Sequence, residues 1–108
     1  MKKSLAYAAA GEVLTGLALV LVPSIVGPWL LGAPLDAVAT QVARVAGLAL
    51  VGLGIACWPG SPRAGMLIYS GSVAAYLAYL GLVGVTAGVL LWPAVALHVL
   101  LTALLARD

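Results

Sequence analysis

The chain has 108 residues, of which 65% are hydrophobic and 7% are charged, and its formal net charge is +2. An average globular domain has about 25% charged residues, and a soluble chain of this length needs a polar surface that so few charged side chains cannot supply. The composition excludes an ordinary soluble domain and predicts one membrane domain, residues 1–108. The weak, scattered positive charge also excludes a nucleic-acid surface, and the single cysteine excludes an internal disulfide.

Four apolar segments predict four membrane-spanning helices. Each has close to the roughly 20 residues that cross a bilayer core, and helices satisfy their own backbone where no water is present. The first segment follows two lysines, as a signal peptide would, but it is longer than the apolar part of a signal peptide and contains a glutamate. We therefore expect it to be retained as the first helix. The predicted helices are residues 4–22, 37–57, 64–83 and 89–106.

The connections between these segments differ in length. The first, residues 23–36, reads PSIVGPWLLGAPLD and remains apolar, so we expect it in the outer membrane interface. It is either a short helix over residues 24–31 or an irregular loop anchored by Trp29, and Asp36 at its end is a candidate N-cap. The second connection, WPGSPR, is a tight turn, and the third, GVTAG, joins the last two helices as an antiparallel hairpin.

The distribution of charge predicts the orientation. With an even number of spans, Lys2, Lys3, Arg63 and Arg107 all fall on one side of the membrane, and the other side carries only Asp36. The positive-inside rule places the basic side in the cytoplasm. The expected fold is therefore an all-α, antiparallel bundle of four transmembrane helices in a bacterial inner membrane, with both termini cytoplasmic.

Three ionisable side chains are expected near the bilayer midplane. Glu12 lies about nine residues beyond Lys3, roughly 13 Å into the membrane, and Arg44 and His98 lie at similar depths in the second and fourth helices. Because an unpaired charge at this depth is costly, we expect Glu12 and Arg44 to form an ion pair, directly or through Gln41 or His98.

Further polar residues lie at helical spacing. Tyr69, Ser72, Tyr76 and Tyr79 form one stripe on the third helix, and Gln41 lies three residues before Arg44. Four polar faces turned inward would form a hydrogen-bonded core. The members of this candidate polar core are Glu12, Arg44, His98, Gln41, Tyr69 and Tyr76.

The predicted core has either a structural role, fixing the register of the helices, or a role in binding a ligand or relaying protons. No catalytic triad, second carboxylate, phosphate-binding loop or metal-ligand cluster accompanies it. The single histidine does not supply the two axial ligands that a b-type haem commonly takes. We therefore expect neither an enzyme nor a metal or cofactor site.

Two resemblances bear on function. AGEVLTG, with Glu12, resembles the first helix of the small multidrug resistance transporters, whose midway carboxylate binds protons and cationic drugs; Arg44 has no counterpart there. Over most of its length, through LVPSIVGPWLLG, ARVAGLALVGLGIACWPG and LLWPAVALH, the chain looks like uncharacterised small four-helix membrane proteins of proteobacteria. That likeness implies a helix-two arginine and a helix-four histidine, matching Arg44 and His98, and no established activity.

These observations favour a non-enzymatic accessory or interaction subunit of the membrane. Rows of small residues such as Ala39, Ala43 and Gly47 let helices approach closely, within one chain, between copies or against another membrane protein. The expected partners are the lipid bilayer and self-association or a second membrane protein. The alternative is a small transporter or ligand-binding bundle in which Glu12 and His98 bind protons or a ligand.

Overall fold

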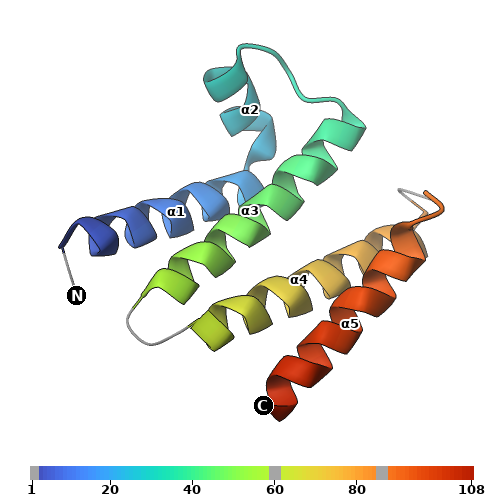
Figure 1. Ribbon diagram of the computed structural model, residues 1–108. Coiled ribbons are helices and arrows are strands. Elements are labelled where there is room, and N and C mark those ends of the chain that lie inside the picture. Colours follow the sequence, from blue (N-terminus) through green and yellow to red (C-terminus); the bar gives the residue numbers. More distant parts are fainter. Residues whose placement is uncertain (1–2, 59–61, 85–87) are drawn as a thin grey trace.

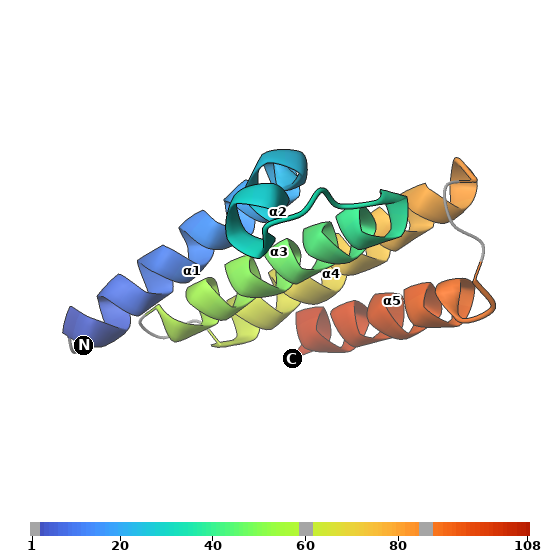
Figure 2. The same ribbon diagram turned by 90° about the horizontal axis from the view of Figure 1, so that it is seen from above.

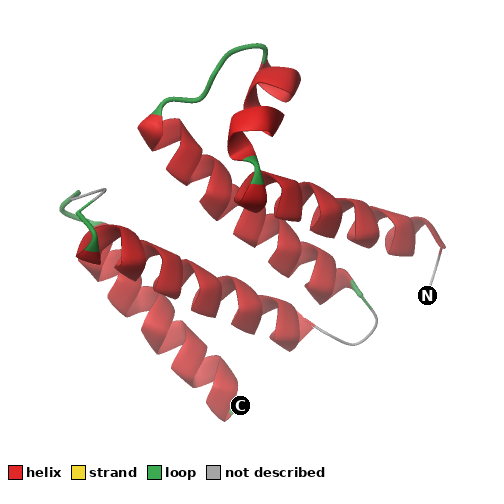
Figure 3. Ribbon diagram, turned by 180° about the vertical axis from the view of Figure 1, so that it is seen from behind, coloured by secondary structure: helices red, strands yellow, loops and turns green. Residues whose placement is uncertain are grey.

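The computed structural model describes residues 3–58, 62–84 and 88–108, which form helices and their connections without a strand (Figures 1 and 3). The predicted all-helical class is confirmed. The described residues form five helices: α1 (Lys3–Leu21), α2 (Pro23–Leu31), α3 (Ala37–Cys57), α4 (Pro62–Leu82) and α5 (Leu91–Arg107).

Three helices, α1, α3 and α4, are long and apolar enough to cross a membrane. The apolar α5 has 17 residues and falls below the length of the other three; at 1.5 Å per residue it measures about 25 Å. The bounds of these four helices agree with the predicted segments to within two residues at each end. The predicted tight turn and the predicted hairpin connection include residues 59–61 and 85–87, which lie outside the described residues.

The first connection contains the short helix, so the alternative of an irregular loop is wrong. Pro23 occupies the first turn of α2, where its missing N–H costs nothing. Gly32 ends α2 with a φ of 82°, a left-handed conformation that favours glycine. The Asp36 carboxylate then accepts a hydrogen bond of 2.7 Å from the Ala39 N–H, which confirms it as the N-cap of α3.

The long helices lie side by side in chain order and form an open row (Figures 1 and 2). Within the described ranges α1 contacts α2 and α3, α3 also contacts α2 and α4, and α4 also contacts α5, while α1 touches neither α4 nor α5. The Cα positions extend over 43 × 40 × 16 Å, a slab that is thin in one direction. The row lacks the contact between first and last helices that would close the predicted bundle.

Glycine contacts on two sides of α3 explain the row. Gly47 and Gly54 of α3 pack against α1, and a Cβ added to Gly47 would lie 2.6 Å from the Gly16 carbonyl oxygen. Gly52 packs against α4, where an added Cβ would lie 3.0 Å from the Gly65 carbonyl oxygen. Gly47 and Gly52 are five residues apart, which turns them about 140° from one another around the helix. α1 and α4 therefore cover nearly opposite sides of α3.

Arg63 joins α4 to the end of α5. Its guanidinium donates to two carbonyl oxygens in the last turn of α5, at 2.8 Å to Leu105 and 3.0 Å to Ala106. These carbonyls carry the negative end of the α5 dipole, so the cation is favourable there. Arg63 also belongs to the first turn of α4, where the positive end of the α4 dipole disfavours a cation. The contact with the last turn of α5 explains why an arginine occupies this position.

We expect Arg63→Gln to lower the stability of the protein in detergent by about 1 kcal/mol, because it removes the charge from the last turn of α5. Thermal unfolding followed by circular dichroism measures this. Arg63→Lys keeps the positive charge but loses the second hydrogen-bond donor, so its stability should lie between that of the wild type and that of Arg63→Gln. A glutamine variant as stable as the wild type would contradict the assignment.

Candidate functional site

The polar residues of α3 and α4 meet in one cluster. Arg44 Nη1 lies 3.4 Å from the Tyr76 hydroxyl, which in turn donates a hydrogen bond to Gln41 Oε1. Gln41 and Arg44 are three residues apart on α3, so both reach the same side of the helix, where Tyr76 of α4 meets them. We call Gln41, Arg44 and Tyr76 the α3–α4 polar cluster.

The direction of these hydrogen bonds follows from the groups involved. A guanidinium can only donate, so the Tyr76 oxygen accepts from Arg44 and its hydrogen is free to donate onward. Gln41 must then accept with its amide oxygen, and its amide nitrogen is left outside the chain of bonds with two N–H donors. Hydrogen bonds in such a chain polarise one another, which strengthens the final donor.

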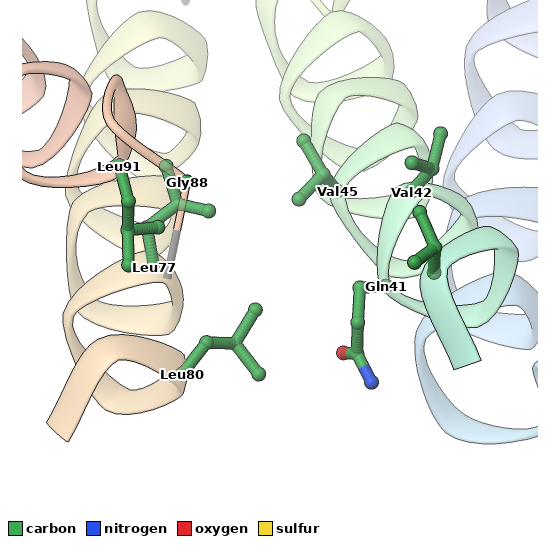
Figure 4. A pocket seen from close by; sticks show the side chains of 8 residues that line it. Gln41, Val42, Val45, Leu77, Leu80, Gly88 and Leu91 are labelled. Atoms are coloured by element: carbon green, nitrogen blue, oxygen red, sulfur yellow. The ribbon is translucent and has the colours of Figure 1, made fainter. Parts of the chain in front are cut away.

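The cluster borders a cavity of about 320 Å³ that lies between α3 and α4 and is also lined by Gly88 and by Leu91 at the start of α5. Figure 4 shows the Gln41 side chain of α3 facing Leu80 of α4 across this space, with valine side chains above Gln41 and leucine side chains on the opposite wall. Gln41 is the only polar side chain among the described lining residues. They are Val38, Gln41, Val42, Val45, Leu77, Leu80, Gly88 and Leu91.

His98 belongs to a separate contact between α4 and α5. Its Nδ1 lies 2.8 Å from the Ala94 carbonyl oxygen, so Nδ1 carries a hydrogen and donates it. The ring meets Tyr69 edge-on, with centroids 5.8 Å apart and planes at 74°. Thr102 donates from its hydroxyl to the His98 carbonyl oxygen at 2.6 Å. These contacts hold the imidazole in one orientation between the two helices.

Glu12 lies apart from both groups. It sits midway along α1 and is half-buried. In the described part of the chain, no carboxylate oxygen lies within 4.0 Å of the Arg44 guanidinium, and Arg44 Nε is buried without a hydrogen-bond partner. The structure therefore does not contain the expected Glu12–Arg44 ion pair. Gln41 contacts Tyr76 and His98 contacts Tyr69, so neither bridges the two charges.

The two charges lie on opposite sides of the α1–α3 contact. Glu12 is two turns from Leu19, which lines a cavity with Asp36, Ala39 and Ala43. Arg44 is three turns from Ile55, which lines another cavity with Ala10 and Leu14. The residues of α1 that contact α3, such as Val13 and Gly16, form a stripe along α1. Leu19 lies on one side of this stripe, and Ala10 and Leu14 lie on the other. The carboxylate and the guanidinium therefore point to different broad faces of the slab.

Their heights differ as well. Gly16 faces Gly47, and Val13 faces Gly54, so α1 and α3 run antiparallel. Glu12 lies four residues before Gly16 on α1, and Arg44 lies three residues before Gly47 on α3. Because the two helices run in opposite directions, these steps lead away from each other along the contact, and Glu12 and Arg44 are separated by seven residues in height. Seven residues correspond to roughly 10 Å along the helices, which is beyond the reach of a direct hydrogen bond.

Ser70 on α4 is a buried polar residue outside the candidate polar core. It is completely buried, and its hydroxyl has no hydrogen-bond partner among the described residues. The tyrosine stripe drew attention to Ser72, two residues further on, which points to a different side of α4. A buried serine has no distinguishing signal in a helix this rich in small residues.

The described residues include no group of three His, Cys, Asp or Glu side chains that could hold a metal ion. What the arrangement offers instead is a directed hydrogen-bond chain beside an apolar cavity, an oriented histidine, and a carboxylate, that of Glu12, without an ionic partner in this part of the chain. Comparisons with protein-family models, with curated proteins and with solved structures found no match to this chain.

Proposed function

We propose that the chain is a small, non-enzymatic integral membrane protein that acts as an accessory or interaction subunit by associating with other transmembrane helices. In this proposal α5 is a fourth span, and the bundle is completed by a second copy or by another membrane protein. The proposed location is a bacterial inner membrane with both termini in the cytoplasm, and the distribution of the basic residues supports this orientation.

The observation that carries the proposal is the half-buried Glu12, on a helix apolar enough to cross a membrane, with no ionic partner in the described part of the chain. A carboxylate in the bilayer core is costly unless a polar group meets it. The open row leaves the flank of α1 that bears Glu12 available to a helix outside the chain. A hydrogen bond or ion pair to that helix would relieve the cost and give the association its specificity.

A second surface supports the same function. Between α4 and α5 lies a groove of about 510 Å³ whose walls are mostly glycine, alanine and valine. Small side chains of this kind allow a partner helix to approach the backbone closely, which is how helices associate where lipid removes the hydrophobic driving force.

Replacing Glu12 by leucine tests the proposal. We expect the wild type to associate in bilayers, and the variant to lose association about tenfold, the size of one intramembrane polar contact. Single-molecule photobleaching of labelled protein in liposomes, together with co-purification of a tagged chain in mild detergent, measures this. Thr15→Val, one turn away on α1, is the matched control and should associate normally. A wild type that stays monomeric and recruits nothing would contradict the proposal.

The same experiment addresses the alternative of a small transporter or ligand-binding protein. It is favoured by the absence of an ion pair to Arg44, since a carboxylate that carries protons or cations must not be neutralised by a fixed cation. Under that alternative Glu12→Leu leaves the oligomeric state unchanged and abolishes proton-coupled flux into liposomes.

A further inference from the structure

The cavity between α3 and α4 combines walls of valine and leucine with one polar group, the Gln41 amide. We propose that it binds an acyl chain of a glycerophospholipid, and that the ester carbonyl of this lipid accepts a hydrogen bond from the Gln41 side-chain nitrogen. This site lies on α3, α4 and the start of α5, away from Glu12 on α1, so the proposal holds whether or not Glu12 mediates association.

The first argument is the direction of the hydrogen bonds. Arg44 donates to Tyr76, and Tyr76 donates to the Gln41 oxygen, so the group left to meet a ligand is the amide N–H₂, which can only donate. A ligand in this cavity must therefore present an acceptor such as a carbonyl or ester oxygen. A ligand whose only polar group is a donor would leave two donors facing each other.

The second argument is depth. Gln41 lies four residues after Ala37, the first residue of α3, which places it roughly 6 Å along the helix. Lipid ester groups lie where the hydrocarbon core meets the headgroup region, the level at which a spanning helix begins. The side chain of a helical residue also tilts toward the N-terminus of its helix, which brings the Gln41 amide closer to that level.

The third argument is the shape and lining of the space. Further along α3 than the amide, and so deeper in the bilayer, the side chains of Val42 and Val45 form an apolar wall that faces Leu77 of α4 (Figure 4). Such a surface suits a hydrocarbon chain and offers it no competing polar contact. The result is a site with an apolar body and a single hydrogen-bond donor at its rim, matching an acyl chain and its ester.

Two lipids that differ only in the ester test this proposal. Purified protein in detergent is titrated with a diacyl phosphatidylcholine or with the dialkyl ether analogue of equal chain length, and bound lipid is counted by native mass spectrometry. We expect the wild type to bind the ester lipid about fivefold more tightly, the size of one net hydrogen bond. Equal binding of the two lipids would overturn the proposal.

Three variants locate the site. Gln41→Leu should bind both lipids equally, and an ester preference that survives in this variant would overturn the proposal. Val38→Trp fills the cavity and retains the Gln41, Tyr76 and Arg44 side chains, so it should weaken the binding of both lipids; unchanged binding would exclude the cavity as the site. Thr40→Val is the matched control, because the Thr40 hydroxyl is engaged by the Asp36 carbonyl oxygen at 2.8 Å, and it should keep the wild-type preference.

Discussion

Replacing Gly47 by alanine is expected to destabilise the protein by about 1–3 kcal/mol, although alanine is the better helix former by about 1 kcal/mol. The added methyl group would lie 2.6 Å from the Gly16 carbonyl oxygen and 2.8 Å from a methyl group of Val20. The backbone oxygen cannot turn aside, so α1 and α3 must move apart along the whole contact. Unfolding by sodium dodecyl sulfate in mixed micelles, followed by circular dichroism, measures the loss.

Gly11 provides the matched control for this prediction. It lies on α1, and an added Cβ there would meet nothing within 4 Å, so Gly11→Ala should leave the stability unchanged or raise it by up to about 1 kcal/mol. Gly16→Ala should act like Gly47→Ala, because its methyl group would lie 2.5 Å from the Gly47 carbonyl oxygen. The double variant should cost less than the sum of the two, since helices already forced apart accommodate the second methyl group. Equal effects of Gly47→Ala and Gly11→Ala would contradict a tight contact.

The helices could be predicted from the sequence because long apolar runs indicate the membrane-spanning segments, and proline and N-cap residues indicate where helices end or begin. Asp36 begins α3 and Pro23 follows the end of α1, as expected. Their packing could not be predicted, because α3 carries glycine on several sides, and its few polar residues, such as Gln41 and Arg44, do not show which helix each glycine meets. Gly52 and Gly54 are two residues apart, yet one packs on α4 and the other on α1. That difference decides between a row and a closed bundle.

The sequence indicated the polar residues of the candidate site, but it did not indicate which of them would meet. The helical spacing drew together Gln41 and Arg44 on one helix and the tyrosines on another, and the structure brings Gln41, Arg44 and Tyr76 into contact. Counting residues from the membrane surface placed Glu12 near the height of Arg44, whereas the glycine contacts between α1 and α3 set the two residues roughly 10 Å apart along the helices. Counting also gave no information on the direction in which each side chain leaves its helix, and the two charges lie on opposite flanks of the α1–α3 contact.

Removing the Tyr76 hydroxyl is expected to cost about 2–3 kcal/mol, a large effect for the loss of one oxygen atom. Among the described residues Arg44 Nε has no hydrogen-bond partner, and the Tyr76 hydroxyl is the one side-chain acceptor for the guanidinium. Tyr76→Phe therefore leaves a partly buried cation, and the Gln41 oxygen, without their partner, and an unmade bond to a charged group costs more than the bond itself contributes.

Two further variants show whether the lost partner, rather than the altered ring, is the cause. Tyr79 stacks on Tyr76 with centroids 6.4 Å apart and is more than half exposed, so Tyr79→Phe changes the same group without uncovering a charge and should alter the stability by less than about 0.5 kcal/mol. Arg44→Leu in the Tyr76→Phe background removes the stranded cation and should recover most of the loss, because replacing both partners of a buried pair by apolar groups is close to neutral. If the double variant were no more stable than Tyr76→Phe alone, Arg44 would not be the group that the hydroxyl satisfies. The assigned order of hydrogen bonds, from Arg44 to Tyr76 and from Tyr76 to Gln41, would then also be wrong.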